Sequence, residues 1–337
     1  MDTGKYFRQV NLPEQKQYDD GVIFPVVLSP NTNFDCNFTA EAKESDFKEA
    51  IKAEKQWIES LVDKYGVILF RGFPVKSASD FNDVVEAFGF PEIEYVGGRA
   101  PRTKVVGRVY TANESPPENR VPFHHEMSYV PDAPSKLFFF CEQEPGKGGQ
   151  TPLVLSHIIY DKMKEKYPEF IAEVEEHGVK NVVVMGDEDD SSNVGGRGWK
   201  SAYMTNDKKV AEERAAKQGA KLEWMHGNAV KVTTGPLPAF RFDKKSQHKT
   251  WFNNIAYTKP VPLNGINVDD HDTYIELGNG GLVSDQAQKE CSKIMEEECV
   301  VVPWKNGDVM LVNNLIVLHA RQPLLKPPRR VLASLCK

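Results

Sequence analysis

The stretch Phe123-His124-His125-Glu126-Met127-Ser128 carries the strongest signal for both fold and chemistry in this sequence. Residues 121–129 form a short, partly apolar run that predicts a β-strand. Because alternate side chains of a strand share a face, we expect His124 and Glu126 to project together and His125 to point away. The helical zinc motif His-Glu-x-x-His does not fit, because Tyr129 stands four residues after His125. The stretch therefore predicts two ligands of a metal site.

A third ligand is expected from residues 307–335, where apolar runs alternate with turn residues. One predicted strand ends at His319, and the next begins just after Arg329 and Arg330. A histidine at one strand end and an arginine at the start of the next strand can reach the same cavity. Two histidines and one carboxylate are the facial ligand set of non-haem iron oxygenases, and a guanidinium binds a carboxylate through two hydrogen bonds.

These motifs resemble those of the taurine dioxygenase and clavaminate synthase superfamily of iron(II)/2-oxoglutarate oxygenases, and especially those of its clavaminate synthase-like plant members. Residues 66–73 are similar to the family's N-terminal strand and turn, and residues 251–253 to a core segment. The resemblance covers about residues 20–337 of the chain. The complete set of motifs is specific to this family, whereas His-x-Glu alone would be a weak signal.

Carried over to this sequence, the resemblance implies three iron ligands: His124, Glu126 and His319. It implies that Thr151, which follows two glycines, contacts the cosubstrate carboxylate near the metal. It also implies that Arg330 binds the distal carboxylate of the cosubstrate. Adjacent strand residues face opposite ways, so only one of Arg329 and Arg330 should enter the site, and the family offset favours Arg330.

The chemistry that the resemblance implies is oxidative decarboxylation of 2-oxoglutarate by O2 at iron(II), coupled to oxidation of a small molecule. Hydroxylation is the expected outcome, with desaturation or ring closure as alternatives at the same metal centre. Ser334 stands where sulfonate-using relatives have a second arginine, which argues against a taurine-like sulfonate substrate.

Two other functions are compatible with the same residues. Two histidines and one glutamate also bind zinc, so the site could activate water in a zinc-dependent hydrolase. The chain could instead be a non-catalytic jelly-roll binding protein. Thr151 and Arg330 favour the oxygenase, because neither alternative requires a carboxylate-binding pair beside the metal.

Composition restricts the partners. The net charge is −6 and no basic run stands out, which argues against nucleic acid. No apolar stretch approaches the roughly 20 residues that span a bilayer, which argues against a membrane protein. The five cysteines have no metal-type spacing, and the N-terminus does not resemble a signal peptide, so we expect reduced thiols in a cytoplasmic protein.

The fold is expected to be α+β, with a double-stranded β-helix (jelly roll) core flanked by helices. That topology is implied by the resemblance, since the strand pattern itself indicates only mixed β-structure with helices. The proposed ligands lie far apart in the sequence, so residues 1–337 should form a single oxygenase domain. Residues 1–90 would supply an N-terminal arm and helices, and residues 156–222 a helical and loop insertion.

Hydrophobic spacing and turn signals predict the individual elements. Residues 1–40 should be an irregular arm, residues 97–119 a loop that could cover the substrate, and residues 186–220 the least regular segment. The predicted helices are 45–64, 79–88, 156–167, 168–177, 205–219 and 285–298. The predicted strands are 67–70, 121–129, 136–141, 229–234, 239–242, 249–253, 309–312, 315–318 and 331–335.

Overall fold

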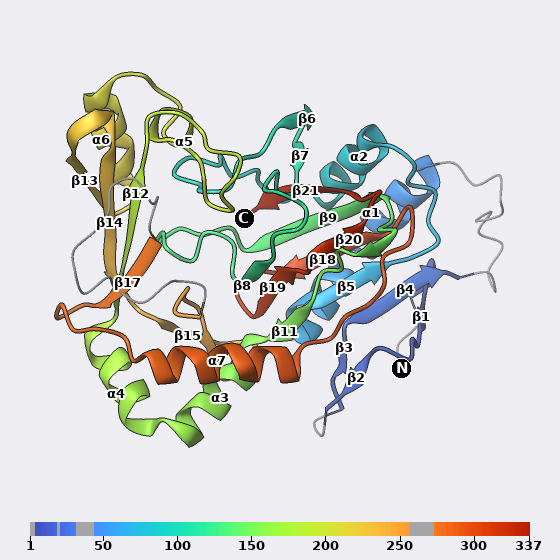
Figure 1. The fold of residues 1–337 in the computed structure, drawn as a ribbon. Helices are drawn as coiled ribbons and strands as arrows, with labels where there is room; N and C mark the ends of the chain where they lie inside the picture. The colour runs from blue at the N-terminus through green and yellow to red at the C-terminus, as the bar shows by residue number, and fades with distance from the viewer. Residues whose placement is uncertain (1–3, 19–20, 32–43, 257–272) are drawn as a thin grey trace.

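The structure is a computed structural model, and it describes residues 4–18, 21–31, 44–256 and 273–337. Within these ranges, sheets occupy the middle of the molecule and helices lie around them (Figure 1). The mixed class of helices and sheets is therefore confirmed. The jelly-roll topology stays a prediction.

The largest sheet in the described part of the chain has eight strands. Its centre is made by β9, whose buried run Leu-Phe-Phe-Phe-Cys reads as a continuous apolar stretch because both faces of the strand are covered. In order across the sheet, the strands are β1 (Phe7–Val10), β4 (Val26–Pro30), β5 (Val67–Phe70), β18 (Val309–Asn313), β9 (Lys136–Gln143), β21 (Arg330–Cys336), β7 (Val109–Thr111) and β6 (Lys104–Val106).

Two helices cover one face of this sheet. They are α1 (Glu44–Tyr65) and α2 (Ala78–Phe88), and the second begins at a Ser77 capping box and ends at Gly89 in the left-handed conformation. Phe138 and Phe140 of β9 point into this layer and are fully buried, which is worth about 2 kcal/mol of transfer free energy for each ring.

The opposite face of the large sheet meets a smaller sheet. This sheet has the order β11 (Leu153–Leu155), β19 (Val317–Arg321) and β8 (Val121–His124), so β19 lies between the other two strands. Leu137 and Phe139 of β9 belong to the same buried cluster as Leu153, Leu155 and Val317. The space between these two sheets holds the site described below.

A third sheet and four further helices complete the frame (Figure 1). The sheet has the order β13 (Ala220–Trp224), β14 (Val230–Leu237), β12 (Val179–Met185) and β17 (Thr273–Leu277). The helices are α3 (Ser156–Lys166), α4 (Pro168–His177), α6 (Lys208–Lys217) and α7 (Asp285–Glu298). Short elements are α5 (Trp199–Ala202), the 3-10 turn His226–Asn228, and the pairs β2 (Lys16–Gln17) with β3 (Ile23–Phe24), β10 (Lys147–Gly148) with β20 (Leu324–Lys326), and β15 (Phe240–Asp243) with β16 (His248–Trp251).

Three regions differ from the sequence prediction. Residues 1–40 are not simply an irregular arm, because β1 and β4 join the large sheet and bury Phe7, Val26 and Leu28 against the α1 and α2 layer. Residues 97–119 are not all loop, because β7 pairs with β21. The strands β12, β13 and β17 were not predicted. The partners of β12 come from distant segments, and local sequence does not reveal such pairing.

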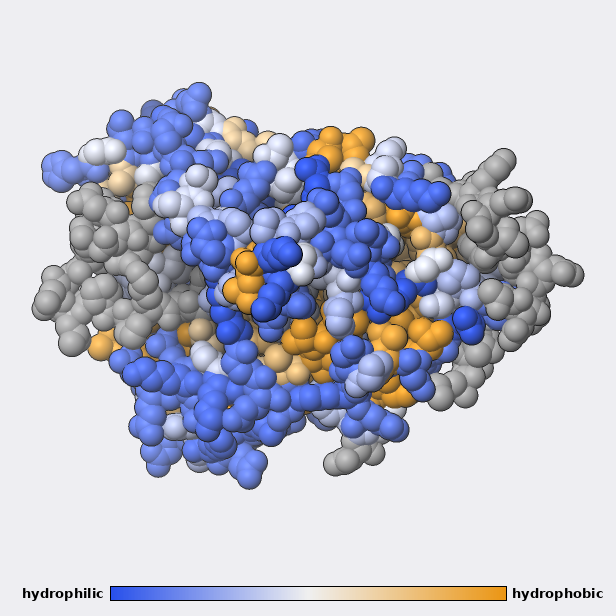
Figure 2. All heavy atoms as spheres, turned by 45° about the vertical axis from the view of Figure 1, so that its right-hand side comes forward, coloured by the Kyte–Doolittle hydropathy of each residue, from blue (hydrophilic) through white to orange (hydrophobic). Residues whose placement is uncertain are grey.

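The face seen in Figure 2 is largely hydrophilic, with hydrophobic side chains gathered toward its centre and right. Among the described helices, none is both long and apolar enough to cross a bilayer. Cys141, Cys291, Cys299 and Cys336 carry free thiols, and Cys36 lies outside the described residues.

Candidate metal centre

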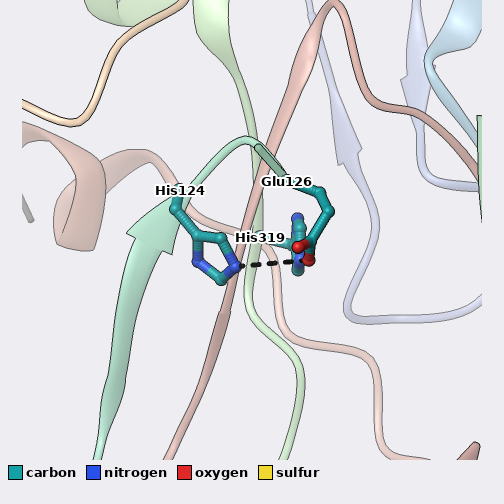
Figure 3. A group of neighbouring side chains, drawn as sticks. All are labelled: His124, Glu126 and His319. Atoms are coloured by element: carbon teal, nitrogen blue, oxygen red, sulfur yellow. Dashed lines mark ion pairs between the residues drawn. The ribbon is translucent and has the colours of Figure 1, made fainter. Parts of the chain in front are cut away.

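The side chains of His124, Glu126 and His319 point toward one another, and the two histidines come from β8 and β19 of the smaller sheet (Figure 3). One ligand atom from each residue lies within 4.8 Å of the others. The two histidines meet because His319 and His124 are direct partners in the pairing of β19 with β8, which places their ring centroids 4.3 Å apart. The His124 Nε2 and Glu126 Oε2 atoms are 4.0 Å apart.

Glu126 reaches the site from a turn, which corrects the reasoning from strand alternation. The strand β8 ends at His124, the chain turns over residues 126–129, and Met127 has a φ of 54°. Asn314 fixes this turn. Its Oδ1 accepts a hydrogen bond from the Glu126 amide at 2.8 Å, and its Nδ2 donates to the carbonyls of Glu126 at 3.0 Å and Pro134 at 2.7 Å. Asn314 is fully buried.

His125 has a packing role, and its ring lies against Phe252 with centroids 4.6 Å apart. Its Nε2 lies 2.8 Å from the Trp251 carbonyl, and its Nδ1 forms a short contact with the Asn314 carbonyl. Burial lowers the pKa of His125 to about 3. The His125 ring therefore contacts two segments that are distant in the sequence, whereas His124 and Glu126 face the site.

Burial favours the neutral form of both histidines of the triad, which is the form that binds a metal. Burial lowers the pKa of His319 well below its ordinary value, and the neighbouring His124 acts in the same direction. Burial also lowers the pKa of His124, although Glu126 opposes that shift. The Nδ1 atom of His319 is buried without a hydrogen-bond partner. Two neutral imidazoles and one carboxylate that converge in this way fit a divalent transition metal.

A cavity of about 240 Å³ opens beside the triad. The large sheet contributes Phe139 and Val331 to its wall, and the Phe139 ring lies 5.3 Å from that of His319. The insertion contributes residues 193–195. The segment 97–119, which was considered as a substrate cover, contributes several lining residues, among them Arg102 and Asn113.

Thr151 lines this cavity and is almost fully buried. Its Oγ1 accepts a hydrogen bond from Trp304 Nε1 at 3.0 Å, so the threonine hydroxyl keeps its own proton for a ligand. The preceding Gly149 has a φ of +69°, and a Cβ at this position would approach Arg329 Cδ to 2.7 Å. The Gly149 carbonyl accepts a hydrogen bond from Arg329 Nε at 2.6 Å. The turn thus positions both Thr151 and Arg329.

The structure places Arg329, and not Arg330, in the cavity wall. The Arg330 side chain is half exposed and forms an ion pair with Glu142 of β9. Burial, together with repulsion from Arg321, lowers the pKa of Arg329 to about 10. The family offset favoured Arg330 as the arginine that enters the site, whereas the structure lines the cavity with Arg329 and leaves Arg330 half exposed.

Ser334 also lies on the side of β21 that faces away from the cavity. Its neighbours at alternate positions, Leu332 and Cys336, belong to the cluster beneath α1 and α2, whereas Val331 lines the cavity. Ala333 shares the face of Val331 and is the residue of this strand to compare with a second arginine. The argument against a sulfonate substrate therefore depends on Ala333, which has no charged side chain, and not on Ser334.

The cavity is also lined by Arg99, Arg102 and Arg321, which the sequence analysis missed. Arg102 donates from its terminal Nη2 to Glu126 Oε2 at 2.6 Å, and Arg321 donates to Ser115 Oγ at 2.9 Å and to the carbonyls of Pro116 and Asn119, both at 2.8 Å. Neither residue belongs to a motif. Arg321 could have been noticed because it follows His319 by two residues on a predicted strand, whereas Arg102 stands among other charged residues without a distinguishing signal.

A triad of this composition, set between two sheets beside an arginine-lined cavity, is the active-site arrangement of an iron-dependent oxygenase. Residues 29–336 match the model of the family described as "Taurine catabolism dioxygenase TauD, TfdA family", and the chain belongs to that family. The family resemblance drawn from the motifs is confirmed. The protein is an oxidoreductase of the dioxygenase class, and its triad fits iron(II).

Among its relatives, the chain is 50% identical over 329 residues to a clavaminate synthase-like protein of Arabidopsis thaliana, with 97% of each chain covered. It is 24% identical over 275 residues to the dapdiamide synthesis protein DdaC of Enterobacter agglomerans, with 79% of this chain and 80% of that protein covered. The first relative fits the plant-type resemblance of the motifs.

Solved structures agree on the fold. The PvcB protein from Pseudomonas aeruginosa matches with a TM-score of 0.51 at 13% identity, covering all of this chain and 93% of PvcB. AAD-2, solved in complex with Mn(II) and N-oxalylglycine, matches with the same TM-score and identity, covering 98% of this chain and 96% of AAD-2. At this identity the likeness shows a shared fold.

Proposed function

We propose that this protein couples oxidative decarboxylation of 2-oxoglutarate to hydroxylation of a small organic molecule, with desaturation or cyclisation as variants of the same reaction. The observation that carries the proposal is the position of Arg329. Its side chain is partly buried and lines the cavity that contains the triad, and no described carboxylate forms an ion pair with it. A partly buried arginine that lines a cavity without a carboxylate partner favours an anionic ligand.

One set of side chains would bind the metal, and another would bind the cosubstrate. His124, Glu126 and His319 would hold iron(II) on one face, leaving the positions toward the cavity open. Arg329 would bind the distal carboxylate of 2-oxoglutarate through its two terminal nitrogens, since its Nε is engaged with Gly149. Thr151 would donate its hydroxyl proton to the bound cosubstrate. When bound, the iron supplies the redox chemistry, and the apolar wall around Phe139 and Val331 excludes water from it.

The decisive experiment is an anaerobic titration of the metal-free protein with iron(II) and 2-oxoglutarate, followed by visible spectroscopy. We expect a charge-transfer band that appears only when both are present. Tight zinc binding with no such band would favour the zinc hydrolase. If the protein bound no divalent metal at all, the non-catalytic binding protein would be favoured instead.

The two adjacent arginines give a matched pair of variants. Arg329→Gln is expected to weaken 2-oxoglutarate binding about 10- to 100-fold, because it removes charge-assisted hydrogen bonds inside a buried site. Arg330→Gln removes the same charge one residue away, but at a half-exposed position, and should change the affinity less than about twofold. The concentration of 2-oxoglutarate at half-maximal band intensity measures both. Equal effects of the two changes would contradict the assignment of Arg329.

The proposal also includes a single catalytic unit and a location in the cytoplasm. Ligands from β8 and β19 meet in one site, which supports one catalytic unit across the described residues. The free thiols support a reducing compartment, for which the cytoplasm stays the predicted location.

A further inference from the structure

The indole of Trp304 contacts the cavity wall from behind, through the hydroxyl of Thr151. Its Nε1 donates a hydrogen bond to Thr151 Oγ1 at 3.0 Å, and both side chains are almost fully buried. Among the described residues, neither side chain has another hydrogen-bond partner. A buried indole N–H without an acceptor is costly, so this contact should persist when the cavity is filled. Thr151 lines the cavity and Trp304 does not, so the hydrogen bond connects the wall to a residue outside it.

The backbone on both sides of Thr151 is fixed by other contacts. The Gln150 carbonyl accepts a hydrogen bond from the Gln322 amide at 3.0 Å, and the Pro152 carbonyl accepts one from the Ala320 amide at 3.0 Å. These bonds attach the segment to β19 and to the residue that follows it. The backbone therefore sets where Thr151 lies, and the freedom that remains is in its side chain. Above all, the hydroxyl proton can rotate about the Cβ–Oγ1 bond toward any acceptor in reach.

Trp304 is itself held by a buried ion pair that comes from the turn after β5. Arg71 donates from Nε to Asp308 Oδ1 at 3.0 Å and from Nη2 to Asp308 Oδ2 at 2.6 Å. The same Nη2 donates to the Pro303 carbonyl at 2.6 Å, and Asp308 Oδ2 also accepts from the Lys305 amide at 2.8 Å. Two parallel charge-assisted bonds fix the relative orientation of a guanidinium and a carboxylate. The residues on both sides of Trp304 are therefore fastened, and its indole keeps its direction.

We propose that Trp304 is a positioning residue whose indole N–H directs the Thr151 hydroxyl proton toward the cosubstrate. The inference rests on the proposed function, in which Thr151 donates to 2-oxoglutarate, and adds the residue that makes Thr151 a donor. With the indole N–H against one lone pair of Oγ1, the hydroxyl proton cannot point at Trp304, because two hydrogens would meet. The proton is left on the side of the cavity. A donor that is oriented before its ligand arrives loses less freedom on binding, which strengthens the binding.

The test is a double-mutant cycle on cosubstrate affinity, measured without turnover. The protein is loaded with Mn(II) and titrated with 2-oxoglutarate in a calorimeter. Thr151→Val removes the hydroxyl and keeps the shape of the side chain, so it should weaken binding about tenfold. Trp304→Phe removes the N–H and should weaken binding about three- to fivefold. In the Thr151→Val protein, adding Trp304→Phe should change the affinity less than about 1.5-fold, because the hydroxyl that Trp304 orients is already absent.

Matched variants separate this role from general support of the fold. Trp224→Phe is the control, since its Nε1 donates to Glu212 between β13 and α6, and the same change there should leave the affinity unchanged. Thr151→Ser keeps the hydroxyl and should keep the response to Trp304→Phe. Circular dichroism and urea denaturation establish which variants are folded. If Trp304→Phe does not fold, Arg71→Lys takes its place in the cycle, with an expected two- to threefold loss (roughly) that disappears in Thr151→Val.

Losses that add in the double variant would overturn the inference, because Trp304 would then act on the fold and not through the hydroxyl. Unchanged affinity in a folded Trp304→Phe protein would overturn it as well. If Thr151→Val bound 2-oxoglutarate as tightly as the parent, this inference would fall, while weaker binding by Arg329→Gln would leave the rest of the proposed function in place. Failure of the Mn(II)-loaded parent protein to bind 2-oxoglutarate at all would overturn the proposed function and this inference with it.

Discussion

Replacing His319 with alanine is expected to abolish turnover and to remove the iron–2-oxoglutarate band. His319 lies in the middle of β19, fully within the protein, and its ring contacts His124 and Phe139. No described carboxylate or imidazole other than the triad members converges on this point, so the chain has no substitute ligand to offer. The alanine variant would keep two ligands, which is too few to hold iron(II) firmly. Glu126→Ala should have the same consequence for the same reason.

The measurement is metal content after equilibration with iron(II) under argon, together with the visible spectrum. His226→Ala is the matched control, because His226 is exposed in the 3-10 turn and should bind metal and turn over as the parent protein does. Circular dichroism identifies any variant that has merely failed to fold. A folded His319→Ala protein that retained full iron and activity would exclude the triad as the metal site.

The second large effect is expected at Asn314, which contacts neither metal nor substrate in the arrangement described above. Replacing Asn314 with alanine breaks the hydrogen bonds to both backbone groups of Glu126 and to the Pro134 carbonyl. Each buried backbone group left without a partner costs about 1–3 kcal/mol, so we expect a loss of about 3–5 kcal/mol in the free energy of unfolding. Looser support of Glu126 should also weaken metal binding about 10- to 100-fold.

Urea denaturation of the metal-free protein and a metal titration measure these two losses separately. Asn313→Ala provides the control, because Asn313 is of the same type and also buried, but the one side-chain hydrogen bond described for it joins its Oδ1 to the Leu315 amide at 3.1 Å. Its loss should cost about 1 kcal/mol and leave metal affinity nearly unchanged. Equal losses of stability and of metal affinity in the two variants would show that the hydrogen bonds of Asn314 do not specifically support Glu126.

The triad could be predicted from the sequence because histidine and glutamate side chains are themselves metal ligands. The reason given for Glu126 was nevertheless wrong, since it assumed that β8 continues through residue 129. Whether a strand continues depends on its partner, and here β19 pairs with β8 only from Val121 to His124. The turn that follows depends on Asn314, nearly two hundred residues away in the sequence.

The choice between Arg329 and Arg330 could not be made from sequence, because alternation fixes only that the two face opposite ways. The structure makes the choice at Val331, which lines the cavity together with Arg329, two residues earlier. Arg102 was beyond prediction for another reason. Its role depends on a contact with Glu126 across 24 residues of loop and short strand, which leaves no periodic signal.

The order of strands in the large sheet has a consequence for how a cell makes this protein. The strand β18 lies between β5 and β9, and β21 lies between β9 and β7, yet β18 and β21 come from residues 309–336. A ribosome that adds about 5–20 residues per second completes β5 and β9 many seconds before it makes the strands that belong between and beside them. During that interval the edges of β5 and β9 have no native partner and are open to wrong pairing. Newly made chains should therefore depend on chaperones until residues 309–336 have left the ribosome, and slowing translation should increase aggregation.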